Sequence, residues 1–215
     1  APLDRGYVAE KDKASTYFNI AQLYLQGEKV DLALDYMERW INAGGQPDRD
    51  QKWQLAVLYQ RAEQNQESLK WAEQVFEQDG PNAEREVYDF LIYLYDKTGQ
   101  YGKKAQLLQQ LLARNPNDRK IWDAIAGEFF RADEQRMAFE VQKAMYLAGF
   151  LTKEEEIMRI VNFFNQFDVP FEAAKTLEKE MNAGRIEKDF EKLETLANLY
   201  QVAREYQKAI PVIEE

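Results

Sequence analysis

Apolar residues recur along this chain with the spacing of an amphipathic helix. In the stretch STYFNIAQLYLQG, four of them occupy positions i, i+3, i+4 and i+7, so they share one helical face. They are Tyr17, Ile20, Ala21 and Tyr24. Three residues form the core of the pattern. An aliphatic residue comes first, a second residue follows it directly, and an aromatic residue lies three positions after the second residue. We call the second of these the anchor.

The same pattern occurs six times. Its anchors are Ala21, Ala56, Ile92, Ala126, Val161 and Ala197. Successive anchors lie 35, 36, 34, 35 and 36 residues apart. This near-constant spacing indicates an array of structural repeats.

Each repeat is predicted to contain a second helix. A small residue occurs twelve positions after the anchor in five repeats, and a small side chain there lets two helices approach closely. These residues are Ala33, Ser68, Ala138, Ala173 and Ala209. The third repeat has Lys104 at this position and Ala105 one place later, so we expect its turn to hold an extra residue.

Glycine and proline residues mark the boundaries of the helices. Gly27, Gly99 and the DVP segment at 168–170 fall between the paired helices, and four glycines follow second helices, where positive φ ends a helix. The array is assigned to residues 14–215, after an N-terminal extension at 1–13. Repeats 1 to 6 cover about 14–48, 49–84, 85–118, 119–153, 154–189 and 190–215, the last truncated. Pro211 lies within the last second helix, which should start late, kink, or depend on sequence beyond residue 215.

Composition narrows the possible functions. The chain has 45% hydrophobic and 31% charged residues, a formal net charge of −10, no histidine and no cysteine. The absence of cysteine excludes disulfides and thiolate chemistry. The absence of histidine excludes most zinc or iron ligation. Without a basic stripe, binding to nucleic acid is not expected. No apolar run is long enough to insert into a membrane, and we expect no cofactor, no metal site and no enzymatic activity.

Helix pairs of about 34 residues with small and aromatic signature positions resemble the tetratricopeptide repeat. This resemblance covers about residues 14–215. It implies an all-α fold, a right-handed α-solenoid of about six antiparallel helix pairs. It also implies a scaffold that binds a protein or peptide partner, and no single activity.

A narrower resemblance is carried by the order of several stretches. GFLTKE at Gly149–Glu154 and VPFEAA at Val169–Ala174 contribute most to it. These stretches resemble bacterial periplasmic tetratricopeptide proteins found with TonB–ExbB–ExbD energy-transducing systems. The resemblance implies an exported adaptor that assists TonB-dependent uptake, with TonB-system components as partners. The chain begins APLDRGY without an initiator Met, so we expect a processed or excised form in which a signal peptide is not visible.

The face of the first helices opposite the apolar stripe is the candidate partner site. In a solenoid of stacked pairs the first helices line the inner, concave surface. The candidates on this first-helix face are Phe18, Gln22, Leu25, Trp53, Val57, Gln60, Tyr93, Lys97, Phe130, Arg131, Asn162, Asn165 and Asn198. Exposed apolar groups in the first half favour a partner, and the later amides can pair with a peptide backbone.

Other interpretations remain open at this point. Phe18 and Trp53 are as well explained by packing against neighbouring helices, and surface amides are often only solvated. The protein could also be a structural scaffold of the cell envelope, or a cytoplasmic adaptor resembling co-chaperones. Members of that last class carry basic residues that clamp a carboxylate. The corresponding places here hold Phe18 and Gln22, then Gln54, then Glu86 and Phe90, so that route is not expected.

Overall fold

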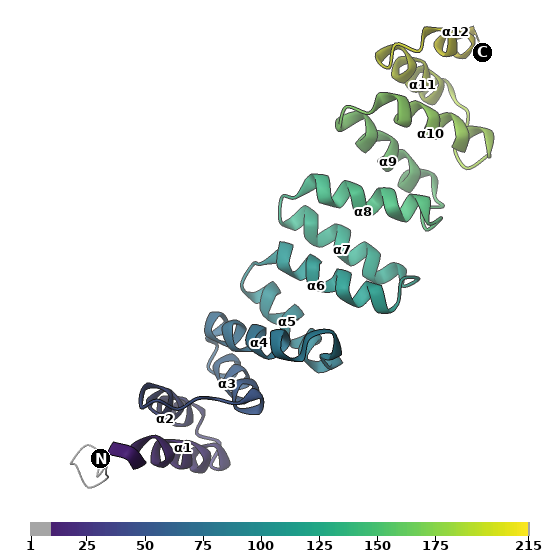
Figure 1. Cartoon of the computed structure of the whole chain (residues 1–215). Coiled ribbons are helices and arrows are strands. Elements are labelled where there is room, and N and C mark those ends of the chain that lie inside the picture. Colours follow the sequence, from purple (N-terminus) through teal and green to yellow (C-terminus); the bar gives the residue numbers. More distant parts are fainter. Residues whose placement is uncertain (1–9, 215) are drawn as a thin grey trace. The chain divides into compact units, whose positions relative to one another are not determined.

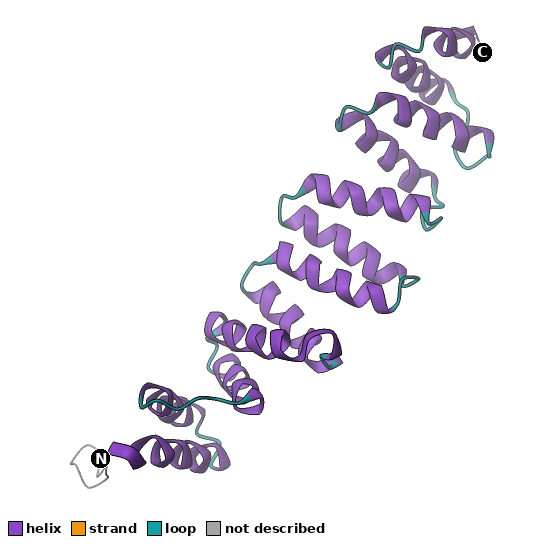
Figure 2. Cartoon of the chain, in the orientation of Figure 1, coloured by secondary structure: helices purple, strands orange, loops and turns teal. Residues whose placement is uncertain are grey.

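The computed structural model describes residues 10–214 as helices joined by short linkers (Figures 1 and 2). Twelve α-helices lie within these residues, with a single 3-10 turn, η2 (Gly80–Asn82). The helices are α1 (Glu10–Gln26), α2 (Val30–Asn42), α3 (Arg49–Arg61), α4 (Asn65–Asp79), α5 (Arg85–Lys97), α6 (Tyr101–Arg114), α7 (Arg119–Arg131), α8 (Gln135–Leu147), α9 (Glu154–Gln166), α10 (Pro170–Asn182), α11 (Phe190–Val202) and α12 (Tyr206–Glu214). The chain is therefore an all-α solenoid of helix pairs, as the sequence predicts.

The chain divides into two compact units, Ala1–Lys104 and Ala105–Glu215, with the division inside α6. In the N-terminal unit, α1 packs against α2 and α3 against α4, while α2 contacts α3 and α4 contacts α5. In the C-terminal unit, the pairs are α7 with α8, α9 with α10 and α11 with α12. There, α8 contacts α9 and α10 contacts α11. Within each unit, the helices of these pairs thus pack together, and the second helix also contacts the first helix of the next repeat.

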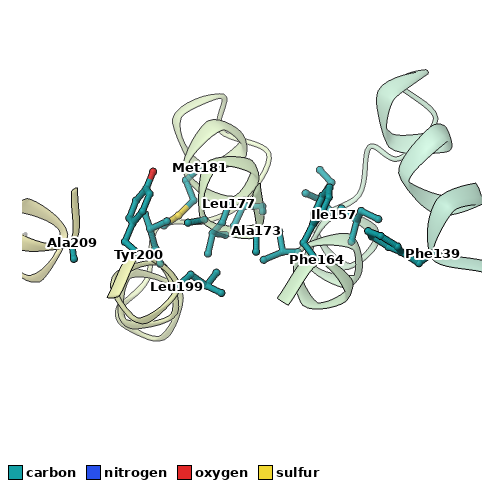
Figure 3. Packing of buried hydrophobic residues seen from close by; sticks show 14 residues of the cluster. Phe139, Ile157, Phe164, Ala173, Leu177, Met181, Leu199, Tyr200 and Ala209 are labelled. Atoms are coloured by element: carbon teal, nitrogen blue, oxygen red, sulfur yellow. The ribbon is translucent and has the colours of Figure 1, made fainter. Parts of the chain in front are cut away.

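The apolar stripe is the core of each repeat. The anchors Ala56, Ala126 and Val161 are at most 4% exposed, and the aromatic residues three positions later, from Tyr59 to Tyr200, are at most 7% exposed. In the C-terminal unit, one buried cluster runs from Phe139 to Ala209 (Figure 3). The stripe therefore packs the first helix against its partner, and in the C-terminal unit it also joins one repeat to the next.

The small residue twelve positions after the anchor lies at the closest approach of the paired helices. Ala33, Ala138 and Ala173 are fully buried. Ser68 is also fully buried, and its hydroxyl donates to the Ala56 carbonyl at 2.7 Å. That bond spans the helix pair and satisfies the one polar atom at this position.

The turn inside the third repeat has the ordinary length, so the prediction of an extra residue there is wrong. α6 begins at Tyr101, nine residues after its anchor Ile92, just as α2 begins at Val30, nine residues after Ala21. Lys104 occupies the place of the small residue, and its charged end pairs with Asp96 of the partner helix α5. Its amine lies 2.9 Å from Asp96 Oδ1, and the side chain is 13% exposed.

The two ends of the array also differ from the sequence analysis. α1 begins at Glu10, four residues before the expected start of repeat 1, and residues 1–9 of the N-terminal extension lie outside the described residues. α12 begins nine residues after Ala197, so the last helix does not start late. Pro211 lies inside it, where it cannot donate to the Gln207 carbonyl.

Candidate functional site

Neighbouring first helices of the N-terminal unit are joined on the first-helix face. The Gln22 side-chain amide of α1 donates to Gln54 Oε1 of α3 at 3.1 Å. Both side chains are half-buried. Gln22 is therefore held by a neighbouring repeat, and part of its hydrogen-bonding capacity is already used.

The predicted apolar candidates at the start of the face are largely occupied by packing. Phe18 lies against Trp40 of α2, with ring centroids 4.9 Å apart. Trp53 packs edge-on against Phe90 of α5 at 4.9 Å. Phe18 and Leu25 are also in contact with the buried cluster of the first two repeats. The packing interpretation therefore accounts for the position of Phe18, Leu25 and Trp53.

A cavity opens further along the same face, between the ends of α3 and α5. Its volume is about 430 Å³, within the range of ligand pockets in proteins. Three predicted residues line it, together with three others. The predicted residues are Gln60, Tyr93 and Lys97, and the additional ones are Arg61, Glu63 and Asn65. Val57, one turn before Arg61 on α3, is half-buried and is not part of the lining.

The cavity carries more positive than negative charge in a strongly acidic protein. Arg61 and Lys97 contribute two cations and Glu63 one anion, against −10 for the whole chain. The Lys97 ammonium lies 5.6 Å from the centre of the Tyr93 ring, a cation–π distance. Tyr93 is 40% exposed. An acidic group or an aromatic side chain could therefore contact this site.

The Asn65 side chain supplies an unsatisfied group at the cavity. Its Oδ1 atom is buried and has no hydrogen-bond partner within residues 10–214. Buried polar atoms without partners are costly.

The C-terminal unit presents its own part of the first-helix face. Phe130 of α7 stacks on Phe163 of α9 with centroids 5.7 Å apart and planes 26° apart, and it stays 39% exposed. Arg131 is exposed and pairs with Glu128 at 3.2 Å. Asn162 and Asn165 of α9 are exposed. These residues lie on the same face without lining a common cavity.

Asn198 lies apart, at the last repeat. It is exposed and lines a cavity of about 310 Å³ between α11 and α12. The walls include Phe190 and Ile213, which are 83% and 62% exposed. This cavity is more apolar than the one at Tyr93, and Asn198 lies at its polar side with Gln201.

Several residues were not found from the sequence. Glu63 and Asn65 belong to the turn and the first residue of α4, so a search confined to first helices could not include them. Their positions, seven and nine after the anchor, face the last turn of the neighbouring first helix. A search extended to the turn would have found them.

The sequence analysis also did not single out an unusual residue in one of the second helices, at the position nineteen residues after the anchor. This position is apolar and at most 7% exposed in Trp40, Val75, Leu111 and Met145. In repeat 5 it holds Glu180, whose side chain is fully buried. A comparison of the repeats at this position of the sequence shows the replacement of an apolar core residue by an acid.

The Glu180 carboxylate is satisfied by two donors. The Tyr146 hydroxyl donates to it at 2.6 Å, and Arg185 forms a close ion pair with it. Burial alone would raise the pKa of Glu180, but the bonds from Arg185 and Tyr146 outweigh it and hold the pKa below the ordinary value. Burial and this bond also raise the pKa of Tyr146. The network ties the linker after α10 to the core.

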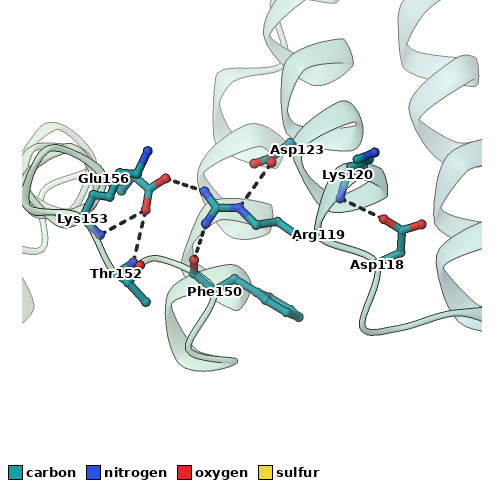
Figure 4. Close-up of polar contacts among 8 residues, drawn as sticks. All are labelled: Asp118, Arg119, Lys120, Asp123, Phe150, Thr152, Lys153 and Glu156. Carbon is teal, nitrogen blue, oxygen red and sulfur yellow. Dashed lines mark hydrogen bonds and ion pairs between the residues drawn. The ribbon is translucent and has the colours of Figure 1, made fainter.

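An ion-pair network of similar kind joins repeats 4 and 5 (Figure 4). The Arg119 guanidinium donates to the Phe150 carbonyl at 2.8 Å and forms a close ion pair with Glu156. Glu156 also accepts from the backbone amides of Thr152 and Lys153. Although burial opposes it, this set of donors lowers the pKa of Glu156. The linker between α8 and α9 is thus fixed by structure-forming contacts.

Neither a metal site nor a membrane span is found in the described part of the chain. No group of three or more histidine, cysteine, aspartate or glutamate side chains within residues 10–214 could hold a metal ion. None of the helices described is long and apolar enough to cross a membrane.

Comparisons with known proteins identify the fold. No family model and no curated protein matches the chain. Among solved structures, the complex of Naa15 and Naa10 bound to HypK-THB is 14% identical, with a TM-score of 0.56, and the match covers 99% of this chain and 32% of that one. MamA from Desulfovibrio magneticus RS-1 is 18% identical over 84% of this chain and 100% of that one, with a TM-score of 0.40. A tetratricopeptide repeat protein from Parabacteroides merdae ATCC 43184 is 12% identical over 94% and 78%, with a TM-score of 0.41. The match to the Naa15–Naa10 complex supports the fold described above, an all-α solenoid of helix pairs.

Proposed function

We propose that this protein is a non-enzymatic scaffold that binds a segment of a partner protein on its first-helix face. The observation that supports it is the cavity between α3 and α5, where Gln60, Tyr93 and Lys97 meet. These three residues are among those that the sequence periodicity predicts for a partner site, and all three line one cavity. Solenoids of this type use such faces to bind extended segments.

The chemistry of the cavity favours an acidic segment with an aromatic or aliphatic side chain. Lys97 and Arg61 attract a carboxylate, and the exposed ring of Tyr93 offers a flat contact surface. A partner of this kind binds by contacts that the folded protein already has in place, which limits the entropy lost on binding.

The finer proposal is a periplasmic adaptor that assists TonB-dependent energy transduction, with TonB-system components as partners. Its support is the resemblance of the GFLTKE and VPFEAA stretches to periplasmic proteins of that kind. In the structure, the first stretch forms the linker fixed by Arg119 and Glu156, and the second begins α10. Both stretches are thus structural, so partner specificity would come from the first-helix face.

The test is capture of TonB-system components by the purified protein and by two variants. Tyr93→Ala and Lys97→Glu should each weaken capture at least tenfold, because one removes the contact ring and the other reverses a charge in the cavity. Both side chains are exposed, so helical circular dichroism should be unchanged. Lys70→Glu is the matched control, since it reverses an exposed charge on α4 outside the face.

The possible outcomes test separately the partner cavity, the scaffold function, the TonB assignment and the compartment. If both variants capture as well as the parent protein, the cavity is not the partner site. If no TonB-system component is captured, but an acidic peptide library still selects binders that Lys97→Glu rejects, the scaffold proposal stands without the TonB assignment. Cell fractionation in the native host tests the compartment, and a cytoplasmic protein would favour the adaptor resembling co-chaperones.

A further inference from the structure

Another cavity lies between α8 and α10, at the junction of repeats 4 and 5 inside the C-terminal unit. Its volume is about 380 Å³, and it is lined by α8, the end of α9, the turn after α9 and the first turns of α10. Phe139 and Phe164 line its buried side, with ring centroids 5.4 Å apart in an edge-to-face contact (Figure 3). No residue of this cavity belongs to the predicted partner site or to the cavity at Tyr93.

Three positions around this cavity depart from the repeat pattern, and each departure makes the wall apolar. Six residues after the anchor, repeat 5 has Phe167, where the other repeats have glycine, alanine or threonine. Eight residues after it, repeat 5 has Val169, where the others have lysine, glutamine or glutamate. Twenty-one residues after it, repeat 4 has Leu147, whereas repeats 1, 2, 3 and 5 have asparagine, glutamate or alanine. All three residues line the cavity.

Packing within the chain does not account for these exchanges. Leu147 is 75% exposed and Val169 is 37% exposed, so neither contributes a fully buried side chain to the core. Phe167 stacks on Phe139 with centroids 4.9 Å apart, but it stays half-buried. Apolar side chains that stay accessible around a cavity are typical of a binding site.

A threonine gives this cavity a polar group on its inner side. Fifteen residues after the anchor, the other repeats have Tyr36, Trp71, Leu107, Val141 and Val212. Repeat 5 has Thr176, which is 6% exposed and lines the cavity. Its hydroxyl has no hydrogen-bond partner within residues 10–214, and such a group is costly when it is buried without a partner.

The first two repeats show what fits the equivalent place. There the corresponding cavity, between α2 and α4, has a volume of only about 260 Å³ and is lined by Trp71. The Trp71 side chain packs against the buried cluster of these repeats. The chain thus places an indole of its own at the position that Thr176 occupies in repeat 5.

The rim of the cavity offers a cation. Lys143 lies 3.7 Å from Glu140, and Glu172 lies 3.9 Å from Lys175. Arg136 is exposed, lines the cavity and forms no ion pair in the described part of the chain. A guanidinium binds a carboxylate through charge-assisted hydrogen bonds, so a ligand with an acidic group complements this rim.

We propose that this cavity binds an indole side chain from a segment of a partner protein, with a carboxylate of that segment against Arg136. The ring lies among Phe139, Val169 and Leu147, and the indole N–H donates to the Thr176 hydroxyl. The occupant is an indole because Trp71 takes the equivalent place in repeat 2, and it is acidic because Arg136 has no carboxylate of its own. This second site shares no residue with the cavity at Tyr93, so it stands independently of the proposed function.

The probe for this site is N-acetyl-tryptophan, which carries an indole and a carboxylate. In methyl NMR spectra of the whole chain, it should shift the signals of Leu147, Val169 and Thr176, with a dissociation constant of about 1 mM. N-acetyl-tryptophanamide, which has no carboxylate, should bind about tenfold more weakly. Arg136→Gln should abolish the difference between the two probes.

Variants that restore the repeat pattern give the decisive test. Val169→Glu and Leu147→Asn introduce residues that other repeats have at these positions, so the fold should be kept while binding weakens at least tenfold. Thr176→Trp should abolish binding, because its indole fills the cavity. Met137→Lys is the matched control, since it changes an exposed residue of α8 outside the cavity to the residue of repeats 3 and 6. Melting temperatures establish that each variant is folded.

Three results would overturn the proposal. The first is the absence of any methyl shift up to about 10 mM N-acetyl-tryptophan, which corresponds to negligible affinity. The second is binding that persists in both Val169→Glu and Thr176→Trp, which would place the probe elsewhere. The third is decanoate that binds the same methyl groups more than tenfold more tightly than N-acetyl-tryptophan, which would assign the cavity to an acyl chain.

Discussion

The hydroxyl of Tyr59 donates to Glu38 Oε1 at 2.8 Å and joins the second repeat to the first. Tyr59 belongs to the first helix of its repeat, and Glu38 to the second helix of the preceding repeat. The ring of Tyr59 is 7% exposed and forms part of the core. One residue thus contributes apolar packing within the repeat and a directional bond to its neighbour.

The two members of this bond change together along the chain. Tyrosine occurs with glutamate at three junctions between repeats. At the other two junctions the aromatic residue is Phe129 or Phe164, and the position of the glutamate holds Gln109 or Lys143. A phenylalanine has no hydroxyl to donate, so a carboxylate there would gain nothing from it. The pattern indicates that the bond is a selected part of the contact between repeats.

We expect this bond to stabilise the N-terminal unit by about 1 kcal/mol. Tyr59→Phe and Glu38→Ala should each lower the free energy of unfolding by about that amount, and the double variant by little more than either. Urea unfolding followed by circular dichroism gives the coupling free energy of this cycle. Gln109→Ala is the control and should have an effect within about 0.5 kcal/mol, because its neighbour is Phe129. Additive effects of the two changes would show that the bond contributes no stability.

Three buried tyrosines and one half-buried tyrosine should make the protein sensitive to alkali. Burial, and then the bond to a glutamate, raise the pKa values of Tyr59, Tyr95, Tyr146 and Tyr200. In the unfolded chain tyrosine titrates near pH 10, so above that pH the unfolded state loses protons that the folded state keeps. The free energy of unfolding is therefore unaffected by these groups below about pH 10 and falls as pH rises further.

This loss can be measured by tyrosinate absorbance together with helical circular dichroism between about pH 9 and 12. The last part of the tyrosinate signal should appear together with the loss of helix, since the four phenols with raised pKa ionise only when the helices unfold. Tyr59→Phe should flatten the pH dependence of its stability in this range. Tyrosinate absorbance that appears in full before any loss of helix would contradict the prediction.

The fold could be predicted from the sequence because the residues that determine it recur with a fixed period and act within single helices and turns. The stripe from Tyr17 to Tyr24 sets a helical face, and its recurrence sets the repeat. Turn geometry is equally local, since a three-residue turn follows every first helix. The extra residue expected near Lys104 was an error because a long side chain can stand at a small-residue position if its charged end reaches Asp96.

The candidate site was less predictable because it depends on how side chains share space. Helical geometry predicts that Phe18 and Tyr93 both lie on the first-helix face. It could not show that Phe18 packs on Trp40 whereas Tyr93 stays open beside Lys97. The contribution of Asn65 depends on the turn between α3 and α4. Three-dimensional contacts between repeats decide these cases, and the spacing along one helix does not.

The buried acid of repeat 5 should be sensitive to the loss of its charge. Glu180→Gln should lower the free energy of unfolding at neutral pH by about 2 kcal/mol, because it breaks the pair with Arg185 and leaves a polar group in the core. Glu180→Met, which introduces the residue found at this position in repeat 4, should cost less. Its partners Tyr146 and Arg185 are partly exposed and can turn to solvent. Urea unfolding of both variants checks the order, and a larger cost for methionine would contradict it.

The same acid should contribute to acid unfolding. Its pKa is lowered in the folded state, so its stabilisation is complete above the unfolded value of about 4.3 and is lost as pH falls below it. The Glu180→Met variant should therefore show a flatter decline in stability between about pH 5 and 2 than the parent protein. Parallel curves for the two proteins would show that other carboxylates, such as Glu156, account for the decline.

The turns inside the repeats offer a gain in stability. Each places the residue seven after the anchor in the left-handed region, and only the third repeat uses glycine there, Gly99 at φ 69°. Glu28 has φ 55° at the equivalent position, which is unfavourable for a residue with a Cβ atom. The amide of the following residue, Lys29, donates to the Tyr24 carbonyl at 2.9 Å, the helix-ending bond that glycine favours.

We expect Glu28→Gly to raise the free energy of unfolding by about 0.5–1 kcal/mol, and Gly99→Ala to lower it by about 1 kcal/mol. Thermal and urea unfolding measure both, and a destabilised Glu28→Gly protein would show that the side chain of Glu28 makes a compensating contact.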